Sequence, residues 1–584
     1  MKIDYQNYNF DYSTLIKEEK AQMKLVPDAA DIEITAKDEH GASGVQLVSE
    51  YGTEGSSNYY FNALVAGNKV TLTAKTGTKI ASAKTTNTAT DLQVANDGMS
   101  ATFTPAAIKI GVNGQISGEV ITVAMEDGLS YTINTVAESL PVLKVTGTGV
   151  SADDAGVYTF QVAGQLIRVN SNREVVYYRN ANCTNPAMPQ NFQVDTIDGV
   201  NYYSYGVKLN PTMTTGGKEC GGFEVMDANY VDQELVTMLP NTDSNHTHGE
   251  GYIDSHEFRV LGPNHYLTLS YTQLEVTNLP SSIQGVNGTS HAYVWAGIFQ
   301  EIKDGKVIKE INTTDYPELF SSAVEDIKYS ESTGDLAKMT SWCDYVHCNS
   351  LDYTLNSDGT VNKLLVSMRD QSAVYQFDMG TGNIEWILGG KASTLSGYDD
   401  YATTRADDNG VEFNAIMFGQ HYARYTAANK DGSIGVSLFD NATGTQPYMY
   451  ENGGIGTHTR VLELTINASK GSATVDNCVN GHKLDLQTGK DHVGDHCGSV
   501  DYWSATSTMI GWGLHIPVDT GTPVAAKYGW SQGDHPIFTD WNDKAGTVSM
   551  ELCVTNSPLA KKKIADGTTT TTMTGAYRTY KSAK

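Results

Sequence analysis

With 584 residues, the chain is too long for a single compact hydrophobic core, so we expect at least two domains. Its formal net charge of -27 argues against binding to nucleic acid or to an anionic membrane surface. Charged residues make up only 18% of the chain, while 56 glycines and 33 tyrosines favour an all-β protein rich in turns. No apolar run reaches the roughly 20 residues that a membrane-spanning helix needs.

The first part of the chain has the pattern of a small β domain. Residues 1–26 predict a short helix or an arm that packs elsewhere, and they lack the apolar segment of a signal peptide. From Asp31 onward, short alternating strands follow one another between Gly, Asn and Asp turns, which is typical of a β-sandwich. The pattern changes near Leu140–Pro141, so we divide the chain into an arm and sandwich domain (1–141) and a second domain (142–584).

The second domain repeats one hairpin pattern: an apolar strand, a turn rich in Asp, Asn and Gly, and another apolar strand. Six copies begin at residues 164, 221, 297, 372, 459 and 536. Their spacing exceeds the ~40–50 residues of compact propeller repeats, so each repeat must carry long loops. The stretch Trp342–Gly390 contains two hairpins in series, which is one blade, and we therefore predict a six-bladed β-propeller. The segment GAYRTYK at 575–581 predicts a strand that completes a blade near the start of this domain.

Three histidines occupy the same position in consecutive repeats, at the start of the inner hairpin. They are His256, His347 and His421. In a blade, the start of the first strand and the end of the second lie side by side on one rim. This places His347 and Asn349 beside Arg369 at the mouth of a central channel.

This set of side chains suits an anionic tetrahedral group. The guanidinium of Arg369 offers a planar fork for sulfate or phosphate oxygens, although a salt bridge between blades is the alternative for this arginine. A neutral imidazole can act as a nucleophile, while a second imidazole gives or takes the proton of a phenol. Aromatic residues in the long loops would hold an aromatic leaving group.

At these residues the sequence resembles the bacterial arylsulfate sulfotransferases. The motifs that carry the resemblance are HEFRVLGPN, WCDYVHCNS, SMRDQSAV, IEWILGG, GQHYAR, LFDN, TMIGWG and AYRTYK. The resemblance implies a six-bladed propeller behind a small sandwich domain. It also implies ping-pong transfer of a sulfuryl group from a phenolic sulfate ester to a phenol, without a nucleotide donor and with no cofactor or metal.

The resemblance also assigns roles to individual residues. His421 in the QH motif becomes sulfated, while His256, His347 and Arg369 bind the sulfuryl oxygens and handle protons. Asn349 matches the asparagine of the HxN motif. A hydroxyl from the inner strands of the sixth repeat is also expected, and the candidates are Thr506, Ser507 and Thr508.

Two other functions remain open. A hydrolase would pass the sulfuryl group to water; however, none of the seven cysteines begins the CxP/SxR motif of classical sulfatases. The second alternative is a non-catalytic propeller that binds a glycan or a protein. Such a function does not explain why three consecutive repeats have a histidine at the same position. No GxxxxGK[ST] loop for nucleotide phosphates is present.

The cysteines and the remaining histidines carry weaker signals. Cys478 and Cys497 flank a loop rich in Gly, His and Asp, and a disulfide between them is one possibility. His482, His492 and His496 in that loop lack a regular metal-ligand spacing. Abundant Thr, Asn, Gly and Tyr with little Lys or Arg predict an exported protein, periplasmic or extracellular, whose leader has been removed. A homodimer is a further expectation.

Overall fold

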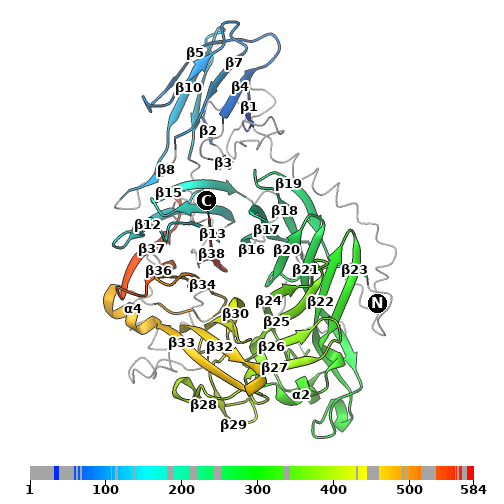
Figure 1. Cartoon of the computed structure of the whole chain (residues 1–584). Coiled ribbons are helices and arrows are strands. Elements are labelled where there is room, and N and C mark those ends of the chain that lie inside the picture. The colour runs from blue at the N-terminus through cyan, green and yellow to red at the C-terminus, as the bar shows by residue number, and fades with distance from the viewer. Residues whose placement is uncertain are drawn as a thin grey trace.

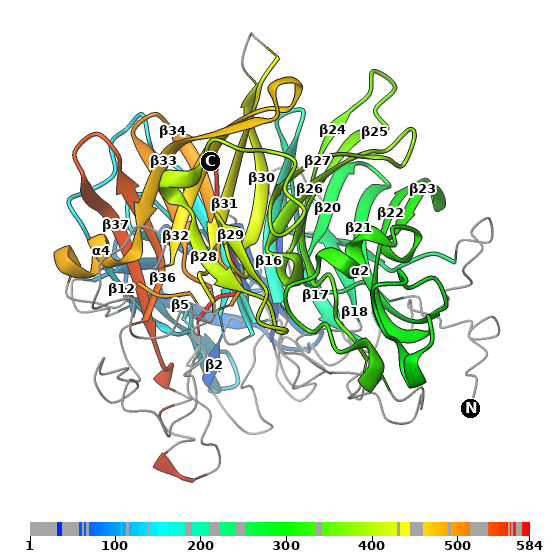
Figure 2. The same cartoon turned by 90° about the horizontal axis from the view of Figure 1, so that it is seen from below.

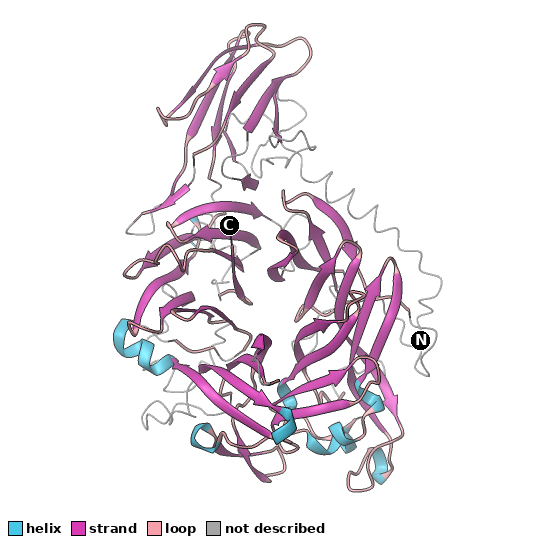
Figure 3. Ribbon diagram, in the orientation of Figure 1, coloured by secondary structure: helices cyan, strands magenta, loops and turns pink. Residues whose placement is uncertain are grey.

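The computed structural model of the chain is built almost entirely from antiparallel sheets (Figure 3). It describes residues 32–37, 58–60, 63–65, 69–106, 108–111, 116–136, 139–162, 164–180, 190–209, 221–240, 252–332, 342–428, 432–443, 459–488, 492–494, 496–513, 535–558, 561, 565–567 and 575–583. The predicted arm at 1–26 lies outside the described residues. No helix in the described part of the chain is long and apolar enough to cross a membrane.

Two four-stranded sheets form the N-terminal part, and their facing sides share one apolar core. The first sheet has the order β1 (Ile32–Lys37), β4 (Lys69–Ala74), β7 (Ser100–Phe103) and β6 (Gln93–Val94). The second has the order β2 (Asn58–Tyr60), β11 (Ser130–Asn134), β10 (Val120–Met125) and β5 (Ile80–Thr85). Alternate residues of β4 and β10 are buried, which is the alternation expected for sheets with one face in a core.

Six larger sheets and one two-stranded sheet, β28 (Thr403–Ala406) with β29 (Glu412–Ala415), follow among the described residues. Figure 1 shows the six larger sheets arranged around a common centre. We number them sheets 1 to 6. The first three are β38 (Thr579–Ser582), β13 (Val157–Val162), β14 (Gln165–Asn170), β15 (Glu174–Asn180); then β16 (Gln190–Ile197), β17 (Val200–Lys208), β18 (Gly221–Met226), β19 (Asp232–Val236); then β20 (Phe258–Gly262), β21 (His265–Val276), β22 (Ala292–Lys303), β23 (Lys306–Asn312).

Sheets 4 to 6 follow the same order, and Figure 2 shows the strands of sheets 3 and 4 on one side of the ring and those of sheet 6 on the other. They are β24 (Cys348–Leu355), β25 (Val361–Met368), β26 (Ala373–Asp378), β27 (Ile384–Gly389); then β30 (His421–Ala428), β31 (Ile434–Asp440), β32 (Arg460–Asn467), β33 (Ser472–Asn480); then β34 (Ser499–Ser504), β35 (Ser507–Gly511), β36 (His535–Asn542), β37 (Thr547–Thr555). The few helices, among them α2 (Glu318–Ser322) and α4 (Gly481–Thr488), lie at the outside of the ring (Figure 3).

Each of the six predicted hairpins forms the third and fourth strands of its sheet in the orders given above, from β14–β15 in sheet 1 to β36–β37 in sheet 6. The prediction for 575–581 is also confirmed, because β38 pairs antiparallel with β13 and completes sheet 1. At the other end of this region, β12 (Val142–Thr146) pairs with β37 and extends sheet 6. Two strands far apart in sequence therefore cover sheet edges that would otherwise be unpaired.

The N-terminal region is also joined to this ring through backbone pairing. Strands β3 (Ala63–Val65) and β8 (Ile108–Ile110) both pair with β15, and β9 (Ile116–Ser117) pairs with β8. Ile108 and Ile110 belong to the same apolar core as residues of β13, β14 and β36. Part of the region that precedes Leu140 thus extends sheet 1.

A buried carboxylate lies where several sheets meet at the centre. Glu257, which directly precedes β20, accepts hydrogen bonds from Arg424 Nη2 at 2.6 Å and from Arg578 Nη1 at 3.1 Å. The backbone N–H of Leu351 in β24 donates to the same oxygen at 3.3 Å. Glu257 is completely buried, as is almost all of Arg578. Burial raises the pKa of the Glu257 carboxyl, but the charges of Arg424, Arg578 and Arg259 outweigh burial and hold the pKa below its usual range.

Replacing this carboxylate should destabilise the fold. Glu257→Gln leaves two buried guanidinium groups without their counter-charge, so we expect a loss of ~3–5 kcal/mol in the free energy of unfolding by chemical denaturation. The exposed Glu126→Gln is the matched control and should stay within about 0.5 kcal/mol of the wild type. Because the folded-state pKa of Glu257 is depressed, the carboxylate contributes fully to the free energy of unfolding at pH values above its unfolded-state pKa of about 4.3. This contribution is lost as the pH falls from there through the folded-state pKa. The difference between wild type and Glu257→Gln should therefore shrink in acid, and a difference that is independent of pH would contradict this account.

Candidate active site

The three predicted histidines come together at the centre of the ring. His256 stands two residues before β20, His347 stands immediately before β24, and His421 is the first residue of β30. The rings of His256 and His347 lie edge to face, with centroids 5.2 Å apart and planes at 87°. Asn349 Nδ2, two residues after His347, donates to the carbonyl oxygen of Gln420 at 2.7 Å, which brings the segment of His347 next to His421. Arg369 Nε lies 3.8 Å from where a Cβ on Gly419 would stand, so Arg369 is also part of this cluster.

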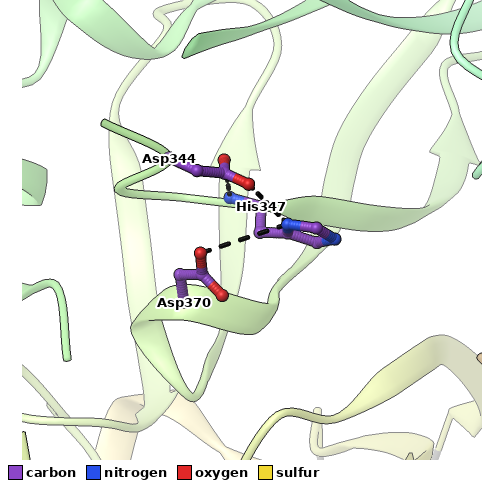
Figure 4. Close-up of side chains that lie close together, drawn as sticks. All are labelled: Asp344, His347 and Asp370. Carbon is purple, nitrogen blue, oxygen red and sulfur yellow. Dashed lines mark hydrogen bonds and ion pairs between the residues drawn. The ribbon is translucent and has the colours of Figure 1, made fainter. Parts of the chain in front are cut away.

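Two of these histidines are held by aspartates that come shortly before them in the chain. His256 Nδ1 is bonded to Asp254 Oδ1, and His347 Nδ1 lies 2.5 Å from Asp344 Oδ2 (Figure 4). Each aspartate also accepts the backbone N–H of its own histidine, at 2.8 Å for Asp254 and 3.2 Å for Asp344. With Nδ1 committed to a carboxylate, proton exchange with a ligand falls to Nε2.

His421 has a different environment. Its Nδ1 lies 3.1 Å from the carbonyl oxygen of Gly419 and 2.7 Å from Asn441 Oδ1. Both atoms only accept hydrogen bonds, so Nδ1 carries the proton of the neutral ring. The backbone N–H of Cys497 donates to Nε2 at 3.2 Å, so this nitrogen carries a lone pair. The contacts of His421 thus define one tautomer, with the proton on Nδ1 and a lone pair on Nε2.

The protonation state of His421 follows from its burial. The side chain is 2% exposed, and burial holds the pKa of His421 well below its usual range. The hydrogen bond with Asn441 acts in the opposite direction, while the charges of His256, Arg369 and His347 lower the pKa further. The imidazole is therefore neutral at neutral pH.

Arg369 lies at the end of the second strand of sheet 4, beside His347. Its backbone N–H donates to the carbonyl oxygen of His347 at 2.9 Å, which is the proximity predicted from the hairpin. Its Nη1 forms ion pairs with Glu325 at 2.8 Å and Asp370 at 2.5 Å. Its Nε is buried without a hydrogen-bond partner among the described residues, and it lies 3.8 Å from where a Cβ on Gly419 would stand. The guanidinium thus forms ion pairs and retains one donor that is unused among the described residues; binding of an anion by this donor stays a prediction.

Asn349 lies in β24, and its Nδ2 donates to the carbonyl oxygen of Gln420 at 2.7 Å. That carbonyl belongs to the peptide bond that joins Gln420 to His421. Asn349 is completely buried, and its Oδ1 has no partner among the described residues. Asn349 therefore connects sheet 4 to the backbone of His421.

The structure does not bring the predicted hydroxyl residues to this cluster. Thr506, Ser507 and Thr508 lie at the turn that joins β34 to β35, whereas the other end of this hairpin, near Ser499, lies next to His421. Their hydroxyls are 3.0, 2.7 and 2.7 Å from carboxylate oxygens of Asp154, Asp540 and Asp543, respectively.

One group of side chains has the composition of a metal site. The possible ligand atoms of Asp344, His347 and Asp370 lie within 4.8 Å of one another, and Figure 4 shows the three together. They are already paired, His347 with Asp344 and Asp370 with Arg369, so a cation would have to replace these bonds. In the loop with three histidines, His492 Nε2 is bonded to Glu551 at 2.6 Å.

The possibility of a disulfide between Cys478 and Cys497 is not realised, because both are free thiols. Cys478 is in β33, whereas Cys497 precedes β34 and contacts His421 through its backbone.

The sequence analysis missed the residues that hold the three rings: Asp254, Asp344 and Asn441. A signal for the first two was present, since each aspartate stands two or three positions before its histidine. Asn441 ends the LFDN motif, but its distance of 20 positions from His421 carries no local signal.

Comparison with known proteins agrees with the motifs. Residues 280–559 match the arylsulfotransferase (ASST) family model, and this stretch belongs to that family. It includes His347, Arg369 and His421, while His256 lies before it. Among proteins with curated functions, none matches this chain.

Several solved structures share a remote likeness. A Bacteroides caccae protein of unknown function is 12% identical, with a TM-score of 0.32, and the match covers 73% of this chain and 98% of that one. Dihydro-heme d1 dehydrogenase NirN is 7% identical, with a TM-score of 0.29 and coverage of 75% and 79%, respectively. A functionally unknown protein from Desulfotomaculum acetoxidans DSM 771 is 10% identical, with a TM-score of 0.28 and coverage of 77% and 98%.

The protonation state of His421 can be measured directly. Because burial depresses its pKa, the ring should stay neutral and keep its Nδ1–H tautomer as the pH is lowered to 6. Nitrogen chemical shifts of histidine-labelled protein would report this, with His421→Gln used to assign the signal. A His421 signal that titrates near pH 6.5 would contradict the assignment.

Proposed function

We propose that the six sheets of residues 142–584 form a six-bladed β-propeller, preceded by a sandwich domain at 1–141. The support is the order of strands within each sheet and the arrangement of the sheets around one centre (Figure 1). Pairing of β38 with β13 and of β12 with β37 is consistent with a ring closed by both ends of this region.

We infer that the protein is an arylsulfate sulfotransferase that works by a ping-pong mechanism through a sulfated His421. The family match supports aryl sulfotransferase activity in general. The observation that carries the specific mechanism is the state of His421, which is buried and neutral, with its proton on Nδ1 and a lone pair on Nε2. An imidazole nitrogen can attack sulfur only in this neutral form.

In the first half-reaction, Nε2 of His421 attacks the sulfur of an aryl sulfate. An N–S bond forms, the S–O bond to the aryl oxygen breaks, and the electron pair leaves with the phenolate. His256 or His347 gives its Nε2 proton to this oxygen, because the aspartate on Nδ1 stabilises the imidazolium before transfer. Arg369 binds the sulfuryl oxygens through its unused donor.

In the second half-reaction, an acceptor phenol occupies the place that the first phenol has left. The same histidine takes the phenol proton, the phenol oxygen attacks sulfur, and the N–S bond breaks with its electron pair returning to Nε2. Nδ1 of His421 keeps its proton throughout, and no nucleotide donor, metal or other cofactor enters either step.

We further propose that the substrates are phenolic sulfate donors and phenol acceptors and that the protein acts after export, in the periplasm or outside the cell, as a homodimer. Incubation with 4-nitrophenyl sulfate, with and without phenol, separates the candidate functions. A transferase releases 4-nitrophenol continuously only with phenol, a hydrolase does so without it, and a binding module releases none.

His421→Ala should abolish release of 4-nitrophenol, including the burst of the first turnover, because no other nitrogen is placed to form the adduct. His256→Ala and His347→Ala should slow the reaction but still leave a detectable adduct. Mass spectrometry of wild type quenched with donor alone should place one sulfuryl group on the peptide that contains Phe418–Arg424. An adduct on His256 or His347 would overturn the roles, and sequential kinetics without an adduct would overturn the ping-pong mechanism.

Arg369→Lys should lower turnover by well over tenfold, since a fork contact to charge that develops in the transition state is worth ~2–4 kcal/mol. Glu325→Gln is the control, because it removes one ion pair of Arg369 and leaves the guanidinium in place. Its turnover should stay within a few-fold of wild type. If Arg369→Lys keeps the wild-type turnover per folded molecule but has a much lower melting temperature, Arg369 has only a structural role as an ion-pair partner.

A further inference from the structure

Asn441 follows β31 directly and contacts His421 and a loop of the next sheet at the same time. Its Oδ1 accepts the Nδ1 proton of His421 at 2.7 Å. Its Nδ2 donates to the carbonyl oxygens of Gly494 at 2.6 Å and Cys497 at 2.9 Å. Asn441 is 3% exposed, so these bonds are made away from water.

The loop that contains Gly494 and Cys497 also contacts the opposite side of the His421 imidazole. Cys497 donates its backbone N–H to Nε2 of His421 at 3.2 Å. A second tie comes from Thr459, whose hydroxyl lies between the carbonyl oxygen of Asn441 and the N–H of Gly494, at 3.2 Å from each. Cys497 has a φ of 64°, a left-handed conformation that a residue with a side chain adopts only when its surroundings impose it. One amide therefore sets the contacts of both ring nitrogens.

The choice of an amide at this position contrasts with the partners of the other two histidines. His256 and His347 both place Nδ1 on an aspartate, and a carboxylate stabilises an imidazolium. An amide oxygen orients the ring equally well and adds no negative charge. In addition, only an amide can accept from His421 and donate to the two loop carbonyls, because a carboxylate has no N–H.

We propose that Asn441 is the positioning residue of the nucleophile: it holds His421 in the Nδ1–H tautomer without adding a negative charge, and it holds the Cys497 amide against Nε2. This inference rests on the proposed sulfuryl transfer through His421. Nε2 has one lone pair, so the hydrogen bond from the Cys497 N–H must break as the N–S bond forms. The freed N–H then lies next to the sulfuryl oxygens and donates to one of them. Asn441 therefore places both the attacking nitrogen and a donor for the group that it receives.

The test compares Asn441→Asp and Asn441→Ala with wild type in the single-turnover burst of 4-nitrophenol from pH 5 to 9. In Asn441→Asp the carboxylate favours the imidazolium, so the acid side of the burst-rate profile should move to higher pH by ~1–3 units. The groups that already act on His421, namely His256, His347 and Arg369, are unchanged in this variant. In Asn441→Ala the burst should slow by about 10- to 100-fold across the range, as when the partner that orients a working histidine is lost.

Two control variants separate positioning from other effects. Asn467→Asp places the same new charge at the far end of β32, where the side chain caps a turn, and should leave the profile unchanged. Thr459→Val loosens the loop without touching the ring, so it should slow the burst without shifting the profile. Nitrogen shifts of labelled histidine should show a single tautomer of His421 in wild type and a mixture in Asn441→Ala.

The outcomes distinguish this inference from the function on which it rests. If wild type forms the adduct on His421 but Asn441→Asp has an unshifted profile and Asn441→Ala bursts within twofold of wild type, the positioning role is wrong and the transferase survives. If wild type forms no adduct, the ping-pong mechanism itself fails. Melting temperatures identify a variant that does not fold. The shift of the burst-rate pH profile in Asn441→Asp is measured by comparing pH values for one variant, so it does not depend on the fraction of that variant that is folded.

Discussion

The arrangement of the sheets at the centre of the molecule depends on the ion cluster around the carboxylate of Glu257. This carboxylate joins segments of sheets 3, 4, 5 and 1 through Leu351, Arg424 and Arg578. Taking a carboxylate and two guanidinium groups out of water is costly, so the arrangement persists only because each charge is closely paired. The ring of Tyr422 completes the cluster, with the guanidinium carbons of Arg424 and Arg578 at 3.9 and 5.0 Å from its centroid.

The same cluster positions the candidate active site. Glu257 follows His256 in the chain, Arg424 is three residues after His421, and Arg578 donates to the carbonyl oxygen of Asn349. The side chains proposed to react are therefore attached to backbone that the ion cluster holds in place. A rigid base of this kind is what a reaction needs when one nitrogen must meet a sulfur atom in a narrow range of geometries.

Above this base, the three imidazoles have different Nδ1 partners; His256 and His421 are buried, and His347 is partly exposed. Nδ1 of His256 and of His347 faces an aspartate, whereas Nδ1 of His421 faces an asparagine, which adds no negative charge. This difference provides a physical basis for dividing acid–base work from nucleophilic attack among residues of one type. Arg369 adds a fixed positive charge, which opposes protonation of His421.

The sequence by itself determined the strands, the six hairpins, the closing strand at 579–582 and the three histidines at equivalent positions. These features follow from alternation and turn chemistry, which act over a few residues and repeat along the chain. Only the tertiary structure decided what holds each histidine. Asn441 and the Cys497 amide reach His421 from 20 and 76 positions away, across the space between two sheets. The hydroxyls at 506–508 are the opposite case. The sequence placed them on the hairpin β34–β35, whose other end contacts His421. Strand pairing puts the hydroxyls at the end away from His421, next to carboxylates that the local sequence pattern does not predict.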